Sequence, residues 1–407
     1  MRIFRTFQSL GPGALVTAAF IGPGTVTVCT LAGAGFGYAL LWALVFATFA
    51  TIVFQEMASR LGTMTGRGLG EALQYSFRAS LWRWPLTALV LVALYAGNAA
   101  YEAGNLSGAA LGAEALFGET QTVFRSSVGA TVVAAALMLM RGNHRHIERL
   151  LIALVVLMAL AFIGTFVAST PAWQALFSGL LIPTLPDGSL ITVVALIGTT
   201  VVPYNLFLHA AAAKQRWHGA KDLVAARNDT IISIGLGGVV AIFIVSTAAA
   251  GLFANGLTAN SAADMAAQFE PLFGTWSRYL LGVGLLAAGV SSAITAPLAT
   301  AYAVSEMLRP NAGANDAWFR MISMSVLLIG AGFALSGIRP VQIILAAQFA
   351  NGLLLPIIAA FLLYAMNQKN IMREHANTFW ANALGGSVFV IATGLGLRSV
   401  ARAIGVA

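Results

Sequence analysis

The chain has 407 residues, of which 59% are hydrophobic and only 9% are charged, and its mean hydropathy is +0.84. Because about a quarter of the residues of a soluble domain are charged, this composition excludes a soluble globular protein. It predicts an integral membrane protein with about a dozen spans of roughly 20 residues each. The single cysteine, Cys29, excludes an internal disulfide framework and a four-thiolate metal site. We expect no cleavable signal peptide.

Eleven apolar segments are predicted to cross the membrane, namely 13–35, 38–59, 85–117, 122–140, 148–170, 190–213, 228–255, 274–305, 318–337, 340–366 and 377–397. With the N-terminus placed in the cytoplasm, 17 of the 22 Lys and Arg residues lie on the cytoplasmic side and the other 5 lie outside. This bias supports both the orientation and the odd number of spans in a cytoplasmic-membrane protein. It also explains the net charge of +8, so we expect the lipid bilayer, and no nucleic acid, as a partner.

Two of these segments carry helix-breaking residues at corresponding positions. The first contains Gly-Pro-Gly at 22–24, and the sixth contains "GTTVVPYN", in which Pro203 lacks a backbone donor. An unwound turn persists in lipid only where a cavity, a ligand or protein satisfies its polar groups. Matching breaks in two halves indicate an inverted-repeat transporter with a solute site near the midplane.

The predicted fold is therefore an all-α integral membrane protein of about eleven transmembrane helices, in which helices 1 and 6 are discontinuous. Two inverted five-helix repeats, at about 13–170 and 190–366, form a single LeuT-like domain, and an extra helix follows at about 377–397. Such a chain transports a solute by alternating access, in which the broken helices rock against the scaffold of helices three, four, eight and nine.

Four stretches carry a family resemblance. Helices one and two of the Nramp family are resembled by "GPGALVTAAFIGPGT…AGAGFGYALLWAL", and the stretch after its helix two by "SRLGTMTGRGLGEAL". Its helix six is resembled by "VVPYNLFLHAA", and its helix ten by "AAQFANGLLLPIIAAFLLYAMNQKNIM". That family consists of proton-coupled divalent-metal transporters. The resemblance implies the two-times-five fold with an eleventh helix, and a divalent cation as the cargo.

The metal-binding motifs of the family are altered. Its helix-one motif is Asp-Pro-Gly-Asn, whereas this chain has Gly-Pro-Gly-Thr at 22–25; its helix-six motif is Met-Pro-His, whereas this chain has Val-Pro-Tyr at 202–204. The anionic, amide and thioether ligands are all replaced. Since selection of a transition metal relies on a soft or nitrogen ligand and a negative charge, we expect neither the family's usual Mn²⁺ or Fe²⁺ site nor a cofactor.

Other positions match the family and imply a proton route. Glu102 lies where the family has a helix-three aspartate, while Asn105 replaces a nearby glutamate. His209 and Arg320 match a helix-six histidine and one of two helix-nine arginines. The residues alone leave a structural role open for each: Glu102 and His209 as packing groups with polar partners, and Arg320 as an anchor at the membrane surface.

The candidate substrate-binding groups are all uncharged: Gly22, Gly24, Thr25, Thr199, Thr200, Val202, Tyr204, Asn205, Gln348 and Asn351. They suit Mg²⁺, which dehydrates reluctantly and keeps several waters. The alternative is a small organic solute, such as an amino acid or carboxylate, held against exposed backbone amides with no metal site. We favour the cation.

Other classes of function have less support. A channel would need a charged ring or a repeated filter signature, and an enzyme would need a clustered nucleophile and base or a metal triad. A receptor is distinguished from a transporter by a flux assay. The identity of the cargo, its direction of flux and the oligomeric state stay open.

Overall fold

The structure is a computed structural model that describes residues 11–13, 21–78, 80–141, 145–309 and 316–403. Its long helices are α3 (Pro23–Phe36), α4 (Leu41–Thr65), α6 (Arg83–Phe117), α7 (Gln121–Arg141), α8 (Arg145–Ala168), α10 (Leu190–Thr200), α11 (Pro203–Arg216), α12 (Leu223–Gly251), α15 (Ser277–Leu308), α16 (Ala317–Ala334), α17 (Pro340–Met366) and α19 (Phe379–Ala403). The shorter helices in the connections are α5 (Leu69–Ser76), α9 (Trp173–Leu181), α13 (Ala262–Ala266), α14 (Glu270–Phe273) and α18 (Lys369–Met372). The described residues form no strand.

Ten helical stretches of the described residues are long and apolar enough to cross a membrane. They correspond to the second to eleventh predicted segments, while the first predicted segment is described at residue 13 and from residue 21 onward. The largest errors at the end of a helix are at α4 and α19, each of which continues six residues past its predicted end, at residues 59 and 397. Arg60 does not end the helix because it pairs with Glu56 on the same helix, and Gly66 in a left-handed conformation ends it instead.

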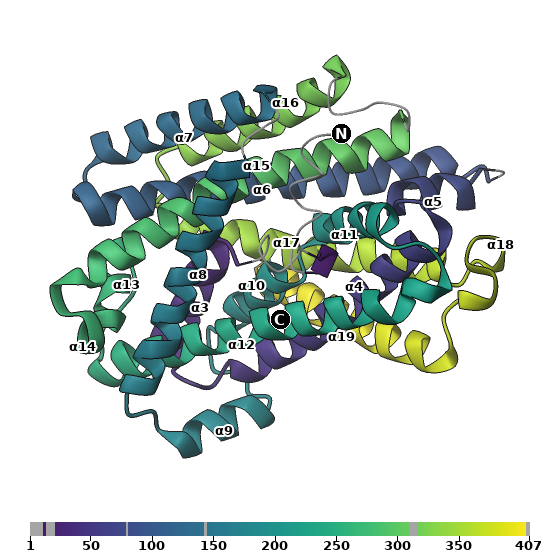
Figure 1. Ribbon diagram of the computed structural model, residues 1–407. Helices are drawn as coiled ribbons and strands as arrows, with labels where there is room; N and C mark the ends of the chain where they lie inside the picture. The colour runs from purple at the N-terminus through teal and green to yellow at the C-terminus, as the bar shows by residue number, and fades with distance from the viewer. Residues whose placement is uncertain (1–10, 14–20, 79, 142–144, 310–315, 404–407) are drawn as a thin grey trace.

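The helices pack as two groups, which Figure 1 shows. In the first, called the α4 group, α4 packs against α10, α11 and α12, and α12 packs against α3. In the second, called the α6 group, α6 packs against α7, α15 and α16. Helix α17 contacts both groups, through α10 and α6.

Glycines allow the close helix contacts within each group. On α6, a Cβ at Gly112 would lie 2.6 Å from the carbonyl oxygen of Gly282 on α15. On α4, a Cβ at Gly62 would lie 3.0 Å from the backbone nitrogen of Lys214 on α11. Each group therefore contains a tightly packed backbone interface of its own.

The helix break of the sixth segment occurs where the sequence predicts it, and the described part of the first segment has the matching helix start. Helix α10 ends at Thr200, Val201 and Val202 are not helical, and α11 begins at Pro203. In the first segment, residues 21 and 22 are not helical and α3 begins at Pro23. Proline suits both starts because the first turn of a helix leaves its N–H groups without partners and needs the φ angle that the ring imposes.

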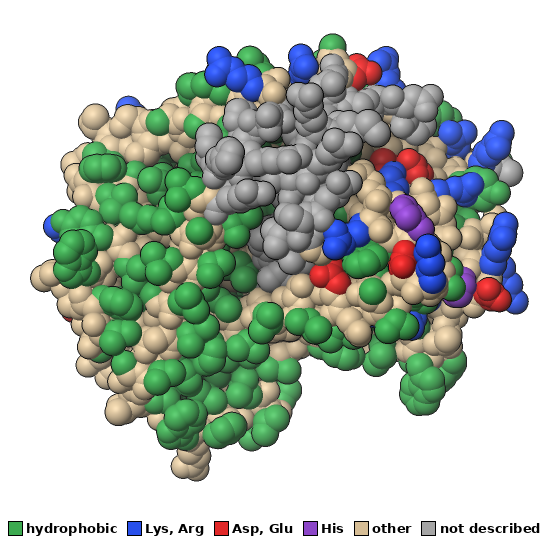
Figure 2. Space-filling model, viewed as in Figure 1, with side chains coloured by type: hydrophobic (Ala, Val, Ile, Leu, Met, Phe, Trp, Pro, Cys, Tyr) green, Lys and Arg blue, Asp and Glu red, His purple; other side chains and the backbone are tan. Residues whose placement is uncertain are grey.

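The surface separates charged from apolar regions. In Figure 2, Lys, Arg, Asp and Glu side chains gather toward the right of the face, where Figure 1 has α5, α11 and α18, and along the upper edge. Large apolar side chains such as Val92, Val167 and Leu236 are more than 60% exposed elsewhere. Such broad apolar exposure is typical of a surface that contacts lipid.

Candidate functional site

The two broken helices meet at a buried pair of hydroxyl groups. The Oγ1 atoms of Thr25, in the first turn of α3, and Thr199, in the last turn of α10, lie 2.9 Å apart in a hydrogen bond. Both residues are fully buried. The ends of the two discontinuous helices therefore lie together, in the arrangement that the paired breaks predict.

Gln348 of α17 lies beside this pair of helix ends. A Cβ at Gly24 of α3 would overlap the Gln348 amide nitrogen and lie 2.8 Å from its Cδ. The backbone is equally close on the other helix, since a Cβ at Gly198 of α10 would lie 3.0 Å from the Cα of Gly352. The Gln348 side chain is buried, and neither of its amide atoms has a hydrogen-bond partner among the described residues. It is thus available to bind a polar cargo.

The α6 group forms the opposite wall of the site. A Cβ at Gly22 would lie 3.0 Å from the Ser292 hydroxyl oxygen on α15 and 3.7 Å from the Tyr101 hydroxyl oxygen on α6. The Tyr101 ring packs edge-on against Tyr204 of α11, with 5.5 Å between the ring centroids. Sequence analysis missed Tyr101 and Ser292. The only signal for them was a polar side chain within an apolar helix.

The other predicted binding residues are placed less centrally. The Thr200 hydroxyl donates to the Leu196 carbonyl within α10, at 2.9 Å, so its hydrogen bond is local. Val202 caps α11, and its carbonyl accepts from the Asn205 backbone N–H at 3.0 Å. The Asn205 and Asn351 side chains are buried, and the described residues offer no partner to either Asn205 amide atom or to the Asn351 Nδ2.

The predicted proton-route residues are not brought together. Glu102 is fully buried, its Oε2 accepts from Asn105 Nδ2 at 3.1 Å, and its Cγ lies 2.6 Å from where Gly330 of α16 would carry a Cβ. Arg320 is exposed at the start of the same helix, ten residues before Gly330, which is about 15 Å along the axis. His209 lies within the α4 group instead, on α11, with its Nδ1 2.9 Å from Gln55 Oε1 of α4.

No cluster of three or more His, Cys, Asp or Glu side chains that could hold a metal ion occurs among the described residues. Cys29 is buried in the apolar core of α3. Hydroxyl and amide groups therefore line the meeting point of the helix breaks, and such groups suit a hydrated cation or a molecule that forms hydrogen bonds.

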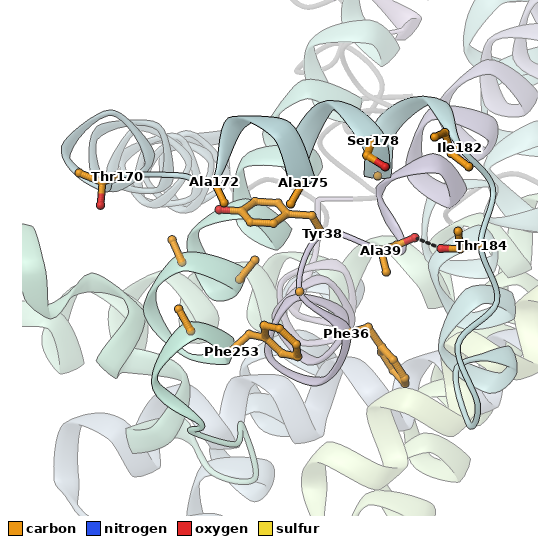
Figure 3. Close-up of a pocket in the computed structure, with 15 residues that line it drawn as sticks. Phe36, Tyr38, Ala39, Thr170, Ala172, Ala175, Ser178, Ile182, Thr184 and Phe253 are labelled. Atoms are coloured by element: carbon orange, nitrogen blue, oxygen red, sulfur yellow. Dashed lines mark hydrogen bonds between the residues drawn. The ribbon is translucent and has the colours of Figure 1, made fainter.

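A separate cavity of about 630 Å³ lies at the other end of α3, where Figure 3 shows it between α9, the end of α12 and the turn after α3. Tyr38 and small side chains such as Ala175 line it. The Thr184 hydroxyl donates to the Ala39 carbonyl at 3.1 Å and holds one wall. The cavity contains none of the predicted substrate-binding residues.

The chain is similar to known proteins over nearly its whole length. The model of a family described as "Natural resistance-associated macrophage protein-like" matches residues 13–402. A protein named divalent metal cation transporter MntH from Klebsiella pneumoniae subsp. pneumoniae is 28% identical over 396 residues, covering 95% of this chain and 92% of that protein. The MntH of Yersinia pestis strain Pestoides F is 29% identical over 393 residues, covering 95% of this chain and 93% of that protein.

Solved structures share the fold. A point mutant of the Eremococcus coleocola manganese transporter matches with a TM-score of 0.77 at 22% identity, covering 96% of this chain and 86% of that one. MhsT in complex with L-phenylalanine matches with a TM-score of 0.61 at 14% identity, covering 95% of this chain and 97% of that one. The predicted LeuT-like fold with discontinuous helices is confirmed.

Proposed function

Because the chain belongs to the Nramp family, we propose that it is a secondary transporter that carries a divalent cation across the membrane by alternating access. The relatives named MntH are divalent metal cation transporters by name. The observation that carries the proposal is the buried Thr25–Thr199 hydrogen bond beside the Gln348 amide, which has no hydrogen-bond partner among the described residues. It joins the two broken helices at a polar point inside a chain of membrane-spanning helices.

The cargo that fits this site is Mg²⁺ with most of its water shell retained. Hydroxyl and amide groups hydrogen-bond well to the coordinated waters of an ion that dehydrates reluctantly. Mn²⁺ and Fe²⁺ sites are favoured by soft or nitrogen ligands, whereas the motif positions here hold Gly22, Thr25 and Val202.

The positive charge of the cargo is balanced in part by the ends of helices. The last carbonyls of α10 have no intrahelical partners and carry partial negative charge. They face the break that ends at Pro203, at the level of Thr199.

Orientation is part of the same proposal. The 17-to-5 division of Lys and Arg supports a cytoplasmic N-terminus. The end of the molecule that carries α5, α11 and α18 then faces the cytoplasm, and the cavity beside α9 faces the outside.

The test is uptake into proteoliposomes that contain the purified chain and a fluorescent Mg²⁺ indicator. We expect saturable Mg²⁺ uptake that Gln348→Ala lowers by about tenfold or more, since a lost hydrogen bond to a charged group is worth roughly 1.5–3 kcal/mol. Gln342→Ala is the matched control, because Gln342 is exposed on the same helix. Faster saturable uptake of Mn²⁺ than of Mg²⁺ would contradict the assignment of the cargo. Uptake of an amino acid or carboxylate, without any cation, would replace the proposal with the organic-solute alternative.

A further inference from the structure

Three charged side chains meet where α11 ends. The Lys214 ammonium lies 2.9 Å from Glu306 Oε1 on α15 and 3.1 Å from Glu71 Oε1 on α5. Helix α11 belongs to the α4 group and α15 to the α6 group, while α5 lies in the chain connection between α4 and α6. This ion-pair cluster therefore crosses the boundary between the two groups of helices.

The loop before α5 holds one side of the cluster. The Gly70 backbone N–H donates to Glu306 Oε2 at 3.2 Å, and the Gly68 N–H donates to Glu71 Oε2 at 3.0 Å. A Cβ at Gly68 would overlap the Glu306 carboxylate, so only glycine allows this approach. Glu306 thus keeps a hydrogen-bond donor on its own side of the boundary when Lys214 leaves.

The side chains of Lys214, Glu71 and Glu306 differ in solvent exposure, and the difference allows Lys214 to separate from the two carboxylates. The Glu306 side chain is only 9% exposed, whereas Lys214 is 19% and Glu71 is 27% exposed. Lys214 is partly exposed, and its long flexible stem lets the ammonium become hydrated after a small shift of α11. An ion pair in this setting is strong enough to hold a closed state, yet neither partner becomes a buried charge without a hydrogen bond when the pair opens.

We propose that Lys214, with Glu71 and Glu306, forms a latch that closes the α5 end of the substrate path and opens whenever cargo enters or leaves at that end. The inference rests on the proposed transport function. Alternating access requires the α4 group to move relative to the α6 group. A shift of a few ångströms between α11 and α15 replaces both contacts of Lys214 with water. Lys214 is thus a positioning residue that sets how often this end of the path is open.

The experiment measures how readily a buried reporter cysteine reacts. Ala303 is fully buried and lies three residues before Glu306, on the same face of α15. We place Ala303→Cys in a Cys29→Ala background and add a membrane-impermeant maleimide at the α5 end of the protein in oriented vesicles. Lys214→Gln should speed labelling about fivefold or more, as expected for loss of a partly buried ion pair. Lys214→Arg, which keeps the charge, should label at the parent rate.

Arg227→Gln is the matched control. Arg227 also loses an ion pair, to Glu56 at 2.7 Å, but that pair joins α12 to α4 within one group. Its labelling rate should equal the parent rate. Glu306→Gln is a second test, expected to speed labelling as Lys214→Gln does.

The proposal fails if both neutral variants label at the parent rate, or if Arg227→Gln accelerates labelling equally. Thermal unfolding of each detergent-solubilised variant identifies any acceleration that comes from loss of the fold, and an acceleration that tracks unfolding also counts against the latch. The assay needs no cargo. If labelling responds as expected while no divalent cation is taken up, the latch stands and the proposed cargo is wrong.

Discussion

Replacement of Gly24 by alanine tests the site most directly, because the added methyl group points at Gln348. Its Cβ would overlap the amide nitrogen and lie 2.8 Å from Cδ and 3.4 Å from Cγ. Ordinary van der Waals contact begins at 3.4 Å, so Cδ must move by at least 0.6 Å (3.4 − 2.8) and the amide nitrogen must move further.

Crowding of this kind in a packed interior costs about 1–3 kcal/mol. If that energy weakens the state in which the cargo is held, Mg²⁺ uptake should fall between about fivefold and a hundredfold, at roughly 1.36 kcal/mol per factor of ten. Alanine in place of glycine also favours the helix by roughly 0.5–1 kcal/mol. Gly129→Ala isolates that second effect, since nothing lies within 4 Å of a Cβ at Gly129 of α7.

The assay is Mg²⁺ uptake by proteoliposomes that contain equal amounts of each variant. On a Gln348→Ala background the clash is gone, so Gly24→Ala should cause little further loss. An uptake rate for Gly24→Ala within twofold of the parent would refute the reasoning. So would an equal loss with and without the Gln348 side chain, because the crowding would then not be the cause.

Three further changes probe the rest of the mechanism. Glu102→Gln removes a fully buried carboxyl group of α6 and should change the pH dependence of uptake. An unchanged pH profile would remove Glu102 from the proton route. Pro203→Ala restores a backbone donor at the start of α11 and should impair uptake while the protein still reaches the membrane. Normal uptake would show that the break does not depend on proline. Thr25→Val breaks the 2.9 Å hydrogen bond to Thr199 and should lower the free energy of thermal unfolding by about 1 kcal/mol. Adding Thr199→Val should then cause little further loss, and additive losses would mean that the two hydroxyls act separately.

Local sequence accounts for most of the fold. Hydropathy along the chain predicts each span because every residue of a lipid-facing helix must be compatible with the bilayer. The break at Pro203 is equally local, since proline lacks the donor that a helix interior requires. The sequence pattern predicts the end of α4 too early, because Arg60 has the pattern of a charge at the membrane surface. In the structure it is 5% exposed, and its partners include Asn377, which lies 317 residues away.

The polar residues of the site show what only tertiary structure decided. Hydropathy does not specify which face of α6 or α15 points at the break, so Tyr101 and Ser292 could not be placed beside Gly22 from sequence. Arg320 and Glu102 match one proton route in sequence, yet they lie on different parts of the α6 group.

Lys214 shows the same limit. It reads as one more positive charge on the cytoplasmic side, but folding brings it against carboxylates 143 and 92 residues away. The sequence by itself determined the membrane class, the spans and the helix breaks, because these depend on the chemistry of neighbouring residues. The partners of each polar side chain depend on how the helices rotate and cross, and that depends on the packing of the whole molecule.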